Sequence, residues 1–77
     1  NELDASDVVL YPNPTTNSVS ITSNEQIIGF EILNLSGQVV ISGANPSAID
    51  VSSLEAGTYF ARVELENTTE IKKLIKK

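Results

Sequence analysis

The chain has 77 residues and a net charge of −5 at neutral pH, and a chain of this length makes one small domain that buries only about 60% of its unfolded surface. It contains no cysteine and no histidine, which removes the usual catalytic thiols, imidazole bases and zinc ligands, and its acidity opposes binding to nucleic acid. We therefore expect no enzyme, no cofactor, no small-molecule substrate and no nucleic-acid partner.

Turn-forming residues recur about every eight to twelve positions, and short apolar runs lie between them. This spacing is typical of an all-β sandwich or barrel, and no segment has sustained helical periodicity. The seven expected strands, in chain order, are Val8–Tyr11, Ser18–Thr22, Ile27–Asn34, Gln38–Ser42, Ala48–Val51, Thr58–Leu65 and Glu70–Ile75.

The first expected strand runs into the stretch LYPNP, in which Pro12 and Pro14 flank Asn13. Neither proline can donate a backbone hydrogen bond, and both restrict the residue before them to extended conformations. Strand pairing must therefore end here. From the residues alone, the stretch is interpreted as a structural stop at the end of a strand.

Alternation indicates which residues of a strand face the core. In the second strand, Val19 and Ile21 point to one face, and we assign that face to the core. In the sixth strand, the core-facing set is Tyr59, Ala61, Val63 and Leu65, opposite Phe60, Arg62 and Glu64. The patterns of the third and last strands are irregular and leave their registers undecided.

The stretch NLSGQVV places Gly37 between two apolar runs. Because glycine takes a positive φ without steric cost, this stretch predicts a tight hairpin between the third and fourth strands.

The stretch LEAGTY carries Leu54, Gly57 and Tyr59 at the start of the longest late strand. A tyrosine in this place is typical of the tyrosine corner of Greek-key sandwiches, in which the phenol binds backbone a few residues upstream. We expect its acceptor between Ser52 and Glu55, and we expect Leu54 to be a buried plug in the turn.

Other kinds of site have weaker support. No Ser-x-x-Lys spacing occurs, so no hydroxyl has a lysine base beside it in sequence. Phe60 is the one aromatic residue expected to face outward as a sugar platform. Calcium could use oxygen ligands, but they do not form an EF-hand loop; the acidic candidates are Glu2, Asp4, Asp7 and Asp50.

The two ends of the chain differ in charge. Residues 1–7 form an acidic, polar segment that we interpret as a linker remnant, and the domain proper covers residues 8–77. The last eight residues, EIKKLIKK, hold four lysines, which either protect a sheet edge against aggregation or bind a partner. No apolar run approaches the roughly 18 residues of a membrane span. Without an initiator methionine or a signal-peptide pattern, we expect one module of a longer protein.

The stretches YPNP, ILNLSGQVV, IDVSSLEAGTYFARV and KKLIKK occur in this order along nearly the whole chain. In order and spacing they resemble the type A C-terminal sorting domain of the type IX secretion system of Bacteroidetes. The resemblance implies an immunoglobulin-like, seven-stranded antiparallel β-sandwich with Greek-key connections, carried at the end of a larger cargo protein.

The resemblance also implies partners and a location. The domain would direct its N-terminal cargo domain from the periplasm through an outer-membrane translocon, to the cell surface or the medium. A sortase-like peptidase would then remove the domain, and we expect the cut within residues 1–7. The alternative is an adhesive or carbohydrate-binding immunoglobulin-like accessory module.

Matched position by position, the resemblance assigns two groups of residues. The structural motif residues are Pro12, Asn13, Pro14, Gly37, Leu54, Gly57 and Tyr59. For the stretch from Pro12 to Pro14 the resemblance implies a second interpretation, a stiff exposed corner that helps to present the surface that the translocon recognises. Lys73 and Lys76 match the lysines of the terminal motif, and together with Lys77 they are the candidate contacts with the translocon.

Overall fold

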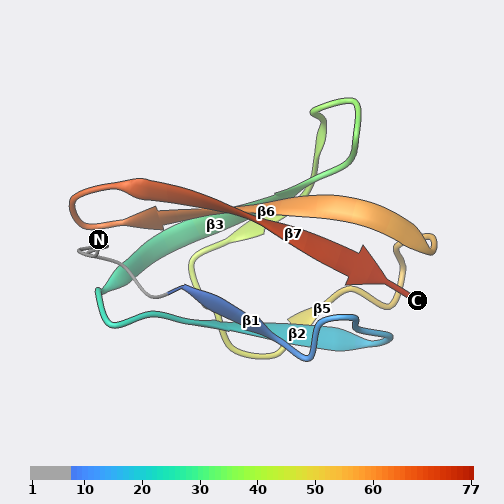
Figure 1. Cartoon of the computed structure of the whole chain (residues 1–77), viewed down its shortest axis with the longest axis horizontal. Coiled ribbons are helices and arrows are strands. Elements are labelled where there is room, and N and C mark those ends of the chain that lie inside the picture. Colours follow the sequence, from blue (N-terminus) through green and yellow to red (C-terminus); the bar gives the residue numbers. More distant parts are fainter. Residues whose placement is uncertain (1–7) are drawn as a thin grey trace.

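The computed structural model describes residues 8–77, which form seven strands in two layers (Figure 1). The strands are β1 (Val9–Tyr11), β2 (Ser18–Thr22), β3 (Ile27–Leu33), β4 (Val39–Gly43), β5 (Ile49–Asp50), β6 (Gly57–Leu65) and β7 (Thr69–Lys76). All seven predicted strands are present, and their ends differ from the prediction by one residue or none. The described residues contain no helix, and therefore no helix that is long and apolar enough to span a membrane.

Two antiparallel sheets face each other as a sandwich. The smaller sheet has the order β1-β2-β5, and the larger has the order β4-β3-β6-β7. The all-β, antiparallel sandwich prediction is therefore confirmed, while the Greek-key connectivity stays a prediction. In the larger sheet β4 and β7 are the edge strands.

The core lies between the sheets and consists of residues from the inner face of each. As predicted, β2 contributes Val19 and Ile21, while β6 contributes Ala61, Val63 and Leu65. Tyr59 is partly buried against this core. A chain with so few aromatic residues fills its interior with β-branched and aliphatic side chains, which suit a pleated surface.

The pairing of strands settles the two registers that alternation left undecided. Phe30 and Ile32 of β3 are buried, so Leu33 faces outward. In β7, Leu74 lies opposite Tyr59 and is fully buried, whereas Ile71 lies opposite Arg62 and is 62% exposed. Residues directly opposite in an antiparallel pair share a face. The residues of β7 that lie opposite core-facing residues of β6 therefore face the core as well.

The predicted hairpin joins β3 to β4, and in Figure 1 it projects from the body of the molecule. Gly37 has a φ of 89° and donates its N–H to the Asn34 carbonyl at 3.0 Å. The Asn34 side-chain oxygen accepts the N–H groups of Ser36 and Gln38, each at 3.0 Å. These three hydrogen bonds, all accepted by Asn34, help to hold this short loop in one shape.

The predicted tyrosine corner is present where the chain enters β6. The Tyr59 hydroxyl donates to the Glu55 carbonyl at 2.8 Å, within the range of acceptors expected from the sequence. Gly57 has a φ of 151°, a conformation that favours glycine. Leu54 contacts the core but is only partly buried, so the expected buried plug is a partial one, because the turn lies at the end of the sandwich.

Candidate functional site

The stretch between β1 and β2 leaves the smaller sheet and binds the edge of the larger one. β1 ends at Tyr11, as the prolines predict, and both the Tyr11–Pro12 and the Asn13–Pro14 peptide bonds are cis. The Asn13 side-chain amide donates to the Lys73 carbonyl at 2.9 Å, and its oxygen accepts the Ile75 N–H at 3.0 Å. We call residues 12–15 the capping segment.

Thr15 continues this pairing with its backbone. Its N–H donates to the Ile75 carbonyl at 2.9 Å, and its carbonyl accepts the Lys77 N–H at 2.8 Å. Its side chain is buried, and its hydroxyl donates to the Ser18 carbonyl. The capping segment thus covers the outer edge of β7 from Lys73 onward and also binds Lys77, the residue after the strand. Without this cover, the unpaired backbone groups of the edge could pair with a strand of another molecule.

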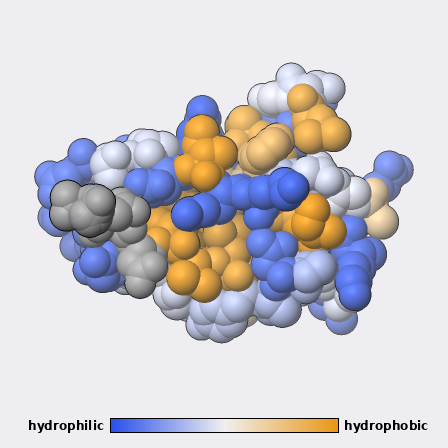
Figure 2. Space-filling model, viewed as in Figure 1, coloured by the Kyte–Doolittle hydropathy of each residue, from blue (hydrophilic) through white to orange (hydrophobic). Residues whose placement is uncertain are grey.

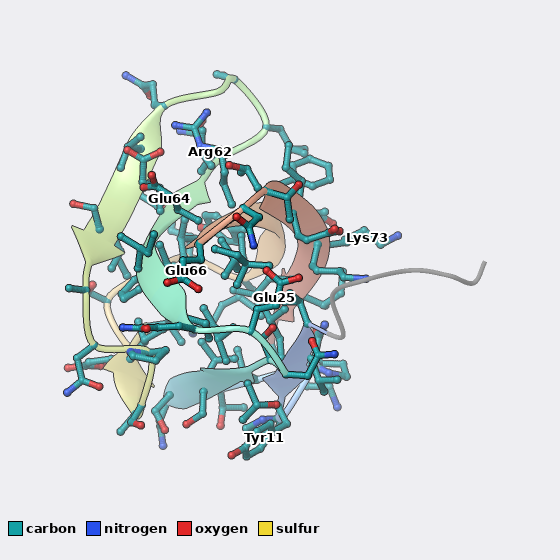
Figure 3. All side chains as sticks on the ribbon, turned by 90° about the vertical axis from the view of Figure 1, so that its left-hand side faces the viewer. Tyr11, Glu25, Arg62, Glu64, Glu66 and Lys73 are labelled. Carbon is teal, nitrogen blue, oxygen red and sulfur yellow. The ribbon has the colours of Figure 1, made fainter. Side chains whose placement is uncertain are left out.

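The three candidate contact lysines do not share one environment. Lys73 and Lys77 are exposed, whereas Lys76 is 8% exposed and its Nζ donates to the Lys77 carbonyl at 3.3 Å. The register explains this difference: Lys76 lies opposite Gly57, on the same side of β7 as buried Leu74, whereas Lys73 lies on the other side, opposite Phe60. Figure 3 shows the Lys73 side chain projecting away from the labelled carboxylates.

Lys73 belongs to the outer face of the larger sheet. It lies opposite Phe60, which is 36% exposed, so the outward orientation predicted for this aromatic residue is confirmed. Beside them, Arg62 forms an ion pair with Glu31 on the neighbouring strand. A hollow above Gly29 follows on the same face, lined by polar residues that include Glu64 and Thr69; Arg62 and Glu64 are labelled in Figure 3.

The acidic residues offer no metal centre in the part of the chain that the structure describes. Residues 8–77 contain no group of three or more acidic side chains that could hold an ion. Asp50 instead accepts both the N–H and the hydroxyl of Ser52, at 2.9 and 2.6 Å, and these bonds hold the pKa of its carboxyl below its usual value. Glu2, Asp4 and Asp7 lie outside the described residues, as does the expected cleavage segment.

The sequence indicated most of these motif residues, but it did not indicate that Asn13 of the YPNP stretch binds β7. Pro12 and Pro14 signal the end of β1, whereas the binding of Asn13 to β7 joins residues 62 positions apart. An asparagine held between two prolines was the signal that could have suggested it. The fixed proline φ angles present such a side chain in a defined direction.

Comparison with known proteins shows that these motifs all lie within a region that matches one protein family. The family model for the secretion system C-terminal sorting domain matches residues 9–77, a range that includes the capping segment, the hairpin, the tyrosine corner and β7. No curated protein matches the chain. The matched family consists of sorting signals and is not an enzyme family, and it does not favour the accessory-module alternative.

The domains of this family are the C-terminal tails of cargo proteins exported by type IX secretion, which places the cargo at the cell surface or in the medium. With nearly its whole length matched and its fold a two-sheet sandwich, this chain belongs to the family of secretion system C-terminal sorting domains and is a sorting signal for type IX secretion.

Proposed function

We propose that the domain sorts its cargo by docking on the outer-membrane translocon through the exposed lysines of its last strand. Docking would take place in the periplasm, before the cargo crosses the outer membrane. The observation that carries this proposal is the position of Lys73 and Lys77, both exposed on an otherwise acidic domain.

The distribution of charge supports a contact at β7. Four of the five basic residues lie within the last six positions, although the chain as a whole carries −5. Within residues 8–77, neither Lys73 nor Lys77 forms an ion pair. Unpaired charge on a surface steers association with an oppositely charged partner. Lys76, the third candidate, would act mainly by supporting the end of β7.

The domain would act by recognition alone. The established role of the family needs no chemistry in the tail itself, and we propose that this chain has no catalytic activity. A sortase-like peptidase would remove the tail from its N-terminal cargo domain within residues 1–7. Mass spectrometry of the secreted cargo checks this step, because the mature protein would then end inside that segment.

The docking proposal is tested by export of a reporter. A fusion of signal peptide, fluorescent protein and residues 1–77 is expressed in a Bacteroidetes host, and reporter is measured in the medium and the periplasm. We expect the intact fusion to leave the cell and the Lys73→Ala/Lys77→Ala variant to accumulate in the periplasm. The Lys73→Arg/Lys77→Arg variant, which keeps both charges, is the matched control and should be exported. Periplasmic retention of the intact fusion would contradict the proposal.

A further inference from the structure

The outer face of the larger sheet carries a group of apolar side chains that the core does not use. A single cross-strand row runs from Val39 of β4 through Leu33 and Phe60 to Lys73 of β7. Ile71 lies next to this row on β7, and Leu35 lies in the adjoining hairpin. We define the outer apolar patch as Leu33, Leu35, Val39, Phe60 and Ile71.

Four of these five side chains are well exposed to solvent, and Leu33 is half-buried among them. Leu35 is 70% exposed, Ile71 62%, Val39 46% and Phe60 36%. The solvent side of an antiparallel sheet is ordinarily polar, and this sheet follows that rule only at its other end, where Glu31, Arg62 and Glu64 face outward. Figure 2 shows hydrophobic residues along the upper surface, above β6 and β7 and on the projecting hairpin. Contiguous exposed apolar surface of this kind is typical of an interaction site.

The patch is hollowed, and the polar groups in the hollow already have partners. Its walls come from β3, the hairpin, β6 and β7, with Leu33, Leu35, Phe60 and Ile71 supplying apolar surface. The Asn34 side chain is occupied by the hairpin bonds, and Arg62 is paired with Glu31. A sugar needs hydrogen-bonding groups around an aromatic platform, whereas this hollow suits an apolar side chain.

Charge at the border of the patch indicates which apolar partner fits. Lys73 ends the row with an exposed ammonium group that has no ion pair within residues 8–77. In a symmetric pair that meets through the patch, the second copy would have to provide a carboxylate opposite Lys73 from beside its own patch, where Glu31 is already paired with Arg62. A different protein with an acidic group beside its apolar contact complements this surface better.

We propose that the outer apolar patch binds a protein partner that inserts an apolar side chain between Phe60 and the hairpin and places a carboxylate against Lys73. The inference rests on the proposed docking function, since the partner is the translocon component that the domain docks on. Apolar burial in the hollow supplies most of the affinity, and Lys73 orients the partner.

The experiment uses the same reporter fusion with neutral substitutions in the patch. Leu35→Ser/Ile71→Thr removes exposed apolar surface, while threonine keeps the strand preference of β7. Loss of side chains from the centre of an interface typically weakens binding about tenfold or more, so we expect a similar fall in exported reporter with accumulation in the periplasm. Val9→Thr is the matched control, because Val9 is 46% exposed on the smaller sheet; its export should match that of the intact fusion. Thermal unfolding of each purified variant establishes that it is folded.

The possible results separate this inference from the proposed function. If the intact fusion is not exported, the docking function fails and the inference fails with it. If the intact fusion is exported and Lys73→Ala/Lys77→Ala is impaired, but the patch variant is exported normally, only the patch inference is wrong. Light scattering of the purified chain adds a further outcome: a dimer that the patch variant converts to monomer would make a second copy the occupant and overturn the proposal.

Discussion

The side chain of Asn13 takes the place of a peptide group beside Ile75. Its oxygen accepts the Ile75 N–H and its NH₂ group donates to the carbonyl two residues earlier in β7. One side chain thus reproduces the donor and acceptor that a neighbouring strand would present. The strand-ending prolines and the final strand, which are far apart in the sequence, form a single structural unit.

This pairing predicts that Asn13 contributes to stability although it is exposed. Asn13→Ala should lower the free energy of unfolding by about 1 to 3 kcal/mol, since two hydrogen bonds are lost and each contributes about 1 kcal/mol net. Asn13→Asp should be at least as damaging, because a carboxylate cannot donate to the Lys73 carbonyl. Urea denaturation measures both. Asn67→Ala, at an exposed turn position, is the control, and equal effects at the two sites would contradict the prediction.

The tyrosine corner predicts a small and specific effect of removing one hydroxyl group. Tyr59→Phe should destabilise the domain by about 1 kcal/mol, the net value of one hydrogen bond. Tyr11→Phe provides the comparison, because Tyr11 is 51% exposed and its hydroxyl has no hydrogen bond within residues 8–77. Thermal unfolding should separate the two variants. A Tyr59→Phe protein as stable as Tyr11→Phe would remove the corner from the account of stability.

Leu54 in the same turn is a test of partial burial. Because its side chain contacts the core without being enclosed, Leu54→Ala should cost about 2 kcal/mol, at the lower end of the range for buried leucine. Chemical denaturation of this variant beside Leu35→Ala, at an exposed position of the hairpin, gives the measurement. A cost of 4 kcal/mol or more, by the same scale, would show that Leu54 is a true core residue.

The hairpin predicts a conformational cost at Gly37. A Cβ at this position would meet no atom within 4 Å, so the cost of Gly37→Ala comes from its φ of 89° alone. We expect a loss of about 1 to 2 kcal/mol. Gly37→Asn should recover part of it, since asparagine tolerates a positive φ better than alanine. Equal stability of the glycine and alanine proteins would exclude this explanation.

The carboxyl group of Asp50 is expected to contribute to the loss of folding stability at low pH. Its hydrogen bonds with Ser52 favour the carboxylate and lower its pKa below 3.8 in the folded state. The stabilisation is therefore complete above the unfolded pKa and is lost as pH falls through the lower folded value. We expect the difference in unfolding midpoint between the native chain and Asp50→Asn to shrink between about pH 6 and pH 2. A difference that stays constant with pH would show that the ionised form is not favoured.

Local patterns were sufficient to predict much of the architecture. The strands followed from alternation and turn spacing, because residues on one face of a strand share one environment. The hairpin followed from Gly37 and the corner from Tyr59, since their hydrogen-bond partners lie only a few positions away. Each of these features depends on interactions within a short stretch of chain.

Features that depend on the pairing of distant strands were not accessible in the same way. The terminal lysines look equivalent in sequence, but the register with β6 buries Lys76 and exposes Lys73. The outer apolar patch draws on four strands and a hairpin, and becomes visible only when the cross-strand row through Phe60 is known. For the same reason, the sequence showed that β1 ends but not where the capping segment binds.

β7 is hydrogen-bonded along one edge to β6 and along the other to the capping segment. The residues at its end therefore contribute to the stability of the domain and also carry exposed charges. Deleting residues 73–77 would take away the fully buried Leu74 and would remove the partners of the Asn13 side chain and of the Thr15 backbone. Retention of a truncated domain in the periplasm would therefore not distinguish loss of the fold from loss of the docking contacts. Single side-chain replacements at Lys73 and Lys77, which leave the backbone whole, are the substitutions that separate the two.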